Sequence, residues 1–75
     1  MVRRFSGRRL REIRKLRGFN REHLAVNADV SASALGRWER GTATPRVNAA
    51  AALVDVLGVT VDALLADLGA GQSGG

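Results

Sequence analysis

The sequence contains no cysteine and a single histidine, His23. The absence of cysteine excludes disulfides, thiolate zinc sites and a cysteine nucleophile. His23 has no second ligand near it in the sequence, so we assign it no metal role and expect neither a metal nor a cofactor. No nucleophile, base and orienting acid occur together, and we therefore predict no catalytic residues and no enzyme activity.

Long apolar runs and strand patterns are also missing. No hydrophobic stretch approaches the roughly 18 residues that a membrane span needs, so we expect no membrane partner. The basic start leads into Gly7-Arg8-Arg9 and not into an apolar segment, which argues against a secretory signal and favours a cytoplasmic protein. Aromatic residues make up only 4%, and apolar and polar residues never alternate for long, so we predict no β-strand.

Basic residues are absent after Arg46, and the net charge of +5 is therefore uneven. Up to Arg46 the 12 basic residues outnumber four acidic ones by eight, whereas the remainder carries three aspartates and no base. All but one of the bases are arginine, whose planar guanidinium suits phosphates and guanine edges. This distribution predicts a polyanionic partner, with nucleic acid ahead of an anionic membrane surface.

The sequence does contain apolar residues at spacings of three and four, which is typical of amphipathic helices. At 75 residues, one small core is all that the chain accommodates, and we predict a compact all-α domain of five helices. The first helix follows an N-cap at Ser6 and ends at Gly18. The other four are predicted over 21–26, 32–40, 45–57 and 61–68, and their N-cap residues are Asn20, Ser31, Thr44 and Thr60, respectively. Residues 1–5 form a basic N-terminal arm, 6–68 the folded domain, and 69–75 a flexible Gly-rich tail or linker.

The second and third predicted helices are short and separated by a turn of about four residues, as in a helix-turn-helix. Ala25 is small where the two helices must cross closely. Asp29 stands where the turn needs a positive φ, which aspartate tolerates. Val30, Leu35 and Trp38 then occupy positions that must be buried. The spacing predicts that the third helix lies across the second with its other face outward.

A longer pattern of residues covers about Ser6 to Leu68. It comprises Leu10-x-x-Ile13-Arg14, Gly18-Phe19, Leu24-Ala25, Val30-Ser31, Leu35, Trp38-Glu39-x-Gly41-x-x-x-Pro45 and Leu53-x-x-x-Leu57-Gly58-Val59. With this pattern the chain resembles the lambda-repressor-like, or xenobiotic-response-element, family of helix-turn-helix regulators. The resemblance implies that the third helix lies in the major groove of DNA while the second crosses the phosphate backbone.

The resemblance also implies a set of site residues. The base-contacting positions would be Ala32, Ser33 and Arg37, the backbone-contacting ones Arg21, Arg40, Thr42, Thr44 and Arg46, and an internal ion pair Arg14 with Glu39. The chain departs from the family at Arg21, where glutamine is frequent, so a hydrogen bond to phosphate becomes a charge contact. Since Ala32, Ala34 and Gly36 cannot hydrogen-bond to base edges, Arg37 is the only bidentate donor on this surface.

Two groups of residues allow alternative interpretations. The N-terminal basic cluster is either a solvated face or a set of arm contacts to the DNA backbone or minor groove; it comprises Arg3, Arg4, Arg8, Arg9 and Arg11. Trp38 fits a core position at its spacing from Leu35, with base stacking as the alternative.

Two functions of different classes follow. The first is a sequence-specific double-stranded DNA-binding regulator, a repressor acting as a homodimer on a palindromic operator. Such a protein would be associated with the nucleoid in the cytoplasm. The alternative is a protein-interaction module or antitoxin-type partner with weak DNA binding, whose interface would be Ala49, Ala52 and Val56 together with surplus apolar surface from Val61 to Leu68. A protein partner, or a further C-terminal domain beyond 69–75, is compatible with both.

Overall fold

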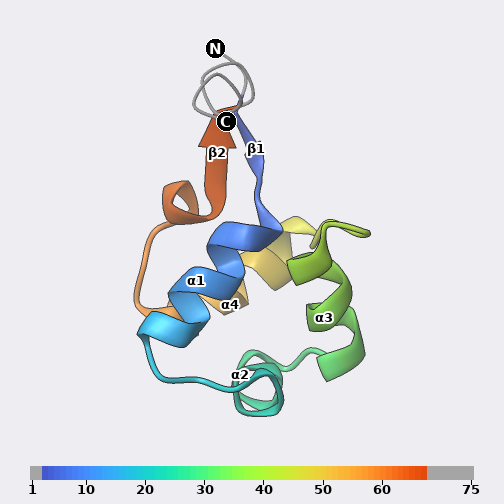
Figure 1. Cartoon of the computed structure of the whole chain (residues 1–75). Helices are drawn as coiled ribbons and strands as arrows, with labels where there is room; N and C mark the ends of the chain where they lie inside the picture. The colour runs from blue at the N-terminus through green and yellow to red at the C-terminus, as the bar shows by residue number, and fades with distance from the viewer. Residues whose placement is uncertain (1–2, 68–75) are drawn as a thin grey trace.

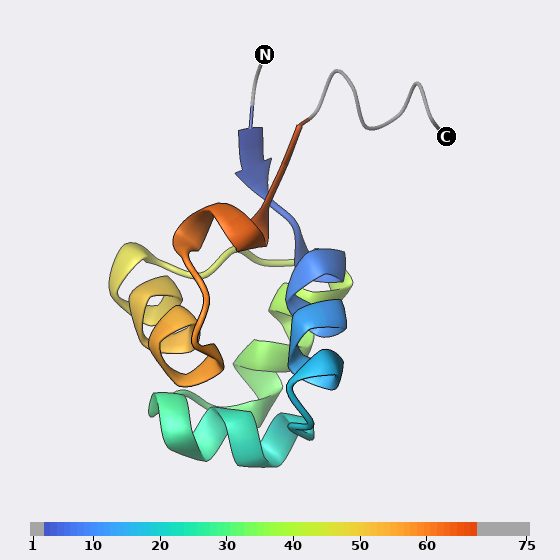
Figure 2. The same cartoon turned by 90° about the vertical axis from the view of Figure 1, so that its left-hand side faces the viewer.

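The computed structural model describes residues 3–67. In chain order it contains β1 (Arg3–Phe5), α1 (Gly7–Leu16), α2 (Arg21–Ala28), α3 (Ala32–Arg40), α4 (Val47–Leu57), a 3-10 helix η1 (Val61–Leu64) and β2 (Leu65–Asp67). The helices form one body, and β1 and β2 project from it as a two-stranded ribbon at the end opposite α2 (Figures 1 and 2).

Three helices begin where the sequence predicts because a side chain caps the first free backbone N–H groups. The Oγ of Ser6 accepts a hydrogen bond from the Arg9 N–H at 3.2 Å, and the Oδ1 of Asn20 accepts one from the His23 N–H at 2.7 Å. The Oγ of Ser31 accepts one from the Ala34 N–H at 3.0 Å. These N-caps are confirmed, and each acts within three residues of its own position.

The prediction of an all-α domain with five helices is wrong at both ends of the described chain. The segment expected to form a helix over 61–68 makes only the η1 turn and then β2, while Leu68 lies outside the described residues. Strand β2 pairs antiparallel with β1, with Phe5 opposite Leu65. Leu64 is only 1% exposed although η1 is a single short turn. The apolar spacing therefore does not require a longer helix to bury this side chain. The strand that competes for this segment lies at the other end of the sequence, where local periodicity cannot detect it.

Helix α4 begins two residues later than predicted. Its N-cap position is Arg46, which is extended at φ −73° and ψ 167° and provides no side-chain cap. Pro45 therefore lies outside the helix. Its fixed φ is compatible with this position, since it suits an extended segment as well as a helical first turn. The end of α4 is as predicted, with Gly58 in the left-handed region at φ 71°.

The core lies between the four α-helices and η1. Its buried members are Leu10, Leu24, Ala25, Ala28, Leu35, Trp38, Leu53, Val54, Leu57 and Leu64. Trp38 is 8% exposed, so its interpretation as a core residue is confirmed over base stacking. Burying this side chain fixes which face of α3 points outward.

Candidate nucleic-acid interface

Helix α2 extends to Ala28, two residues past its predicted end, so the turn that joins it to α3 has three residues, 29–31, and not about four. Asp29 has φ 58° and ψ 45°, which confirms the predicted left-handed turn residue. The Val30 N–H then donates to the Ala25 carbonyl at 3.0 Å, and Ala25 is only 3% exposed where the two helices pack. A small residue at the crossing and a left-handed residue in the turn set the direction in which α3 leaves α2.

The outward face of α3 carries Ser33, Arg37 and Arg40, all exposed at spacings of four and three residues. The guanidinium of Arg37 has no carboxylate partner within residues 3–67. Ala32, the third predicted base-contacting residue, is half-buried and packs against the core. Of the three predicted base-contacting residues, Ser33 and Arg37 are therefore exposed on the same face of α3, whereas Ala32 is partly buried.

A hollow of about 500 Å³ opens beside this face, between α1, α2 and α3. Its lining residues are Arg11, Arg14, Lys15, Arg21, Gly36, Glu39 and Arg40. We call it the cationic hollow, because its five bases face a single carboxylate. Sequence reasoning considered Arg11 only as part of the N-terminal basic cluster, and it did not assign Lys15 or Gly36 to the site. The spacing of four residues between Arg11 and Lys15, which places them on one face of α1, was the available signal.

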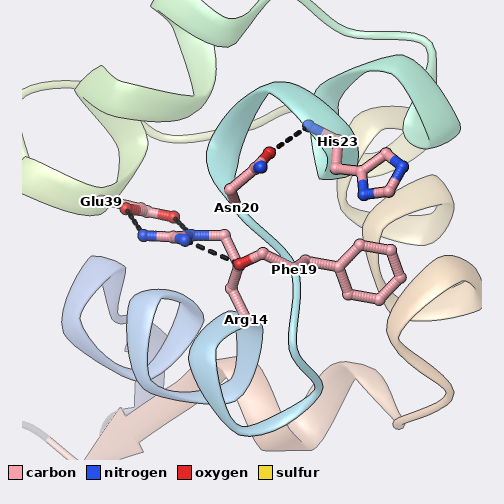
Figure 3. A network of polar contacts seen from close by, with 5 residues as sticks. All are labelled: Arg14, Phe19, Asn20, His23 and Glu39. Carbon is pink, nitrogen blue, oxygen red and sulfur yellow. Dashed lines mark hydrogen bonds and ion pairs between the residues drawn. The ribbon is translucent and has the colours of Figure 1, made fainter.

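The carboxylate in the hollow belongs to an ion pair that joins α1 to α3 (Figure 3). The Nε of Arg14 lies 2.6 Å from Oε2 of Glu39, and Nη2 donates to Oε1 at 3.2 Å. Nη1 of the same guanidinium donates to the Phe19 carbonyl at 2.9 Å. The structure brings together the two residues named for an internal pair and adds a link to the segment that precedes α2. Glu39 is thereby occupied and leaves the other bases of the hollow unneutralised.

The predicted backbone-contacting residues after α3 lie in its C-terminal loop. Thr42, Thr44 and Arg46 are all exposed. The Thr42 hydroxyl donates to the Arg37 carbonyl at 3.2 Å, so it also completes the end of α3. This hydrogen bond holds the start of the loop near the exposed face of the helix.

The N-terminal bases are largely engaged within the protein. Arg3 belongs to β1, and its guanidinium lies 3.5 Å from the Asp62 carboxylate. Arg9 donates from Nε to the Ala63 carbonyl at 2.7 Å. Arg8 lies 3.5 Å from Glu12 in an exposed pair, and Arg4 is exposed on β1. Arg3 and Arg9 thus bind Asp62 and Ala63 of η1, which supports a structural role for part of this cluster.

We expect Arg9→Ala to lower the free energy of unfolding by about 1 kcal/mol, since it removes a hydrogen bond between α1 and η1. Arg8→Ala is the matched control, because Arg8 is the neighbouring arginine and forms only an exposed ion pair. We expect it to change the free energy of unfolding by no more than about 0.5 kcal/mol. Urea denaturation followed by circular dichroism measures both. Equal effects of the two substitutions would contradict the proposed link.

Metal-binding and membrane-spanning features are absent from the described part of the chain. No cluster of three or more potential metal ligands occurs there. None of the helices in residues 3–67 is long and apolar enough to cross a membrane. The His23 ring instead makes an edge contact with Phe19, with centroids 6.1 Å apart (Figure 3).

Comparison with known proteins identifies the fold. A family model described as a helix-turn-helix domain matches residues 7–68. The chain belongs to the helix-turn-helix family. An uncharacterised helix-turn-helix-type transcriptional regulator of Bacillus subtilis, YazB, is 40% identical over 58 residues, which cover 77% of this chain and 84% of that protein. The resemblance to lambda-repressor-like regulators is thereby confirmed.

Solved structures of helix-turn-helix regulators share this architecture. The restriction-modification controller protein C.AhdI of Aeromonas hydrophila has a TM-score of 0.74 and 31% identity, covering 77% of this chain and 88% of its own. The biofilm regulator SinR of Bacillus subtilis, solved in complex with DNA, has a TM-score of 0.74 and 34% identity, covering 77% and 97%. The P22 c2 repressor, solved with a synthetic operator, has a TM-score of 0.75 and 30% identity, covering 81% and 92%.

Proposed function

We propose that this helix-turn-helix regulator is a repressor that binds double-stranded DNA in the cytoplasm, as a homodimer on a palindromic operator. Helices α2 and α3 form the helix-turn-helix unit, with α3 in the major groove. The observation that carries the proposal is the continuity of the exposed face of α3 with the cationic hollow. The first offers groups for base edges and the second offers charge for the phosphate backbone.

Related proteins support the same class of partner. SinR and the P22 c2 repressor were solved with DNA and with an operator, respectively. Dimerisation follows from the sparse chemistry of α3. One bidentate arginine contributes roughly 1–3 kcal/mol of discrimination between bases, so two half-sites are needed for useful specificity.

The alternative interface for a protein partner offers less apolar surface than the sequence indicates. Ala49, Ala52 and Val56 on α4 are half-buried against the core. Leu64 is buried, and Leu65 belongs to β2. Among the described residues of the predicted stripe, Val61 remains the large exposed one, at 48%. These observations favour DNA over a protein as the principal partner.

The proposal is tested by selection from a random duplex library at low and moderate salt. We expect an enriched inverted repeat with guanine in each half-site. Capture that depends on salt but yields no enriched sequence would leave a nonspecific backbone binder and contradict the operator. Absence of capture at both salt concentrations would overturn DNA binding altogether.

With the selected duplex in hand, Arg37→Ala should reduce the preference for guanine by about 1–3 kcal/mol, or roughly 5- to 150-fold, because a bidentate contact to O6 and N7 is lost. Competition binding against duplexes with single-base changes measures this preference. Arg17→Ala is the matched control, since it removes an exposed arginine from the end of α1, outside the face of α3. If both variants weaken every duplex alike, Arg37 contacts phosphate and not a base.

A further inference from the structure

Two arginines from different helices converge on one point above α3. A Cβ built on Gly36 would lie 3.2 Å from Nη1 of Arg21 and 3.2 Å from Nη1 of Arg40. The two nitrogens are therefore no more than twice 3.2 Å apart. Each guanidinium carries a positive charge, so two positive charges from α2 and α3 lie together.

No carboxylate within residues 3–67 neutralises this pair of charges. Glu39 is the carboxylate in the cationic hollow, its side chain is 5% exposed, and both of its oxygens bind Arg14. Neither Arg21 nor Arg40 forms an ion pair with another side chain of the described chain. Their planar donor groups match the geometry of a phosphate, which would supply the missing negative charge.

Gly36 is explained by this arrangement and not by packing against the core. Glycine is unfavourable in the interior of a helix relative to alanine. The side-chain atoms that an added Cβ would meet are the ends of the same two arginines, which are flexible, and no helix backbone blocks the position. The missing side chain leaves room for both guanidiniums close to the surface of α3.

We propose that the guanidiniums of Arg21 and Arg40 bind the same phosphodiester group of the DNA backbone above Gly36. This inference rests on the proposed function and deepens it, since it assigns both arginines to the same phosphate and makes Gly36 part of the site. One phosphate held from α2 and α3 together fixes how the two helices sit on the DNA backbone. The cationic hollow, at about 500 Å³, accommodates the group.

The experiment uses the selected duplex with one phosphate at a time replaced by an uncharged methylphosphonate. We expect the wild-type protein to lose affinity at a particular position in each half-site. Arg21→Gln and Arg40→Gln should each become less sensitive to replacement at that same position, because each variant leaves only one guanidinium on the phosphate. If the two variants lose sensitivity at different positions, the arginines bind separate phosphates and the proposal is overturned, although DNA binding stands.

The salt dependence of binding gives a second readout. With one shared phosphate, the slope of log K against log[salt] should fall by no more than about 0.9 in the double variant, whereas two separate phosphates predict a fall of about 1.8. The double variant should also bind much better than the product of the two single losses predicts. Arg17→Gln is the control for loss of one positive charge outside the hollow.

Gly36→Ala tests the role of the missing side chain at Gly36 without changing either positive charge. We expect a thermal midpoint at least as high as that of the wild type and an affinity for the duplex at least fivefold lower. Unchanged affinity would contradict a role for Gly36. Should the selection capture no DNA, titration with inorganic phosphate decides the site by itself: joint shifts of the Arg21 and Arg40 Nε–H signals would support it, and their absence would overturn it.

Discussion

Replacement of Glu39 by alanine is expected to lower the free energy of unfolding by about 3–5 kcal/mol, because it leaves a buried charge without its partner. Arg14 is 8% exposed and donates two hydrogen bonds to the lost carboxylate. The remaining contact to the Phe19 carbonyl cannot neutralise the guanidinium. Small domains are stable by only about 5–15 kcal/mol. We therefore expect a substantial fraction of the Glu39→Ala molecules to be unfolded at moderate temperature.

Urea denaturation at neutral pH measures the effect, with fluorescence of the single tryptophan, Trp38, as a probe directly beside the substitution. The double substitution Arg14→Met with Glu39→Leu is the control. It removes both charges and keeps apolar volume, so it should recover most of the lost stability. If the double variant is less stable than Glu39→Ala, the hydrogen-bond geometry of the pair and not charge neutralisation provides the stability.

Gly7→Ala is expected to destabilise the fold by about 2–3 kcal/mol through steric overlap. A Cβ at this position would lie 2.8 Å from the Glu39 carbonyl oxygen and closer still to that of Trp38. Both atoms belong to the backbone of α3, so relief requires that α1 and α3 move apart. That movement would also strain the ion pair between Arg14 and Glu39.

Thermal denaturation of Gly7→Ala beside Gly36→Ala separates this mechanism from a general effect of glycine. Both glycines are helical and buried, but the second faces only flexible arginine ends. We expect a lower midpoint for the first variant alone. A midpoint of Gly7→Ala equal to that of the wild type would mean that the first turn of α1 adjusts without disturbing α3.

The helices could be predicted largely because their signals are local. Ser6, Asn20 and Ser31 each cap a helix through a hydrogen bond three residues ahead, and Asp29 takes the left-handed conformation predicted for the turn. Thr60 also stands at an N-cap position and belongs to the residue types that favour it, but its side chain makes no cap hydrogen bond. There the chain forms η1 and then follows β1, a partner that no local pattern indicates.

The sequence by itself determined where α1, α2 and α3 begin, the buried face of α3 and the concentration of positive charge up to Arg46, because capping, periodicity and composition depend on neighbouring residues. Only the tertiary structure decided which charges remain free. Arg3 and Arg9 bind η1, about 54 to 59 residues further along the chain, while Arg21 and Arg40 meet above Gly36. Contacts between residues so far apart depend on how the helices pack. Packing divides one basic sequence into arginines that bind other parts of the protein and exposed arginines, such as Arg21 and Arg40, that have no carboxylate partner among residues 3–67.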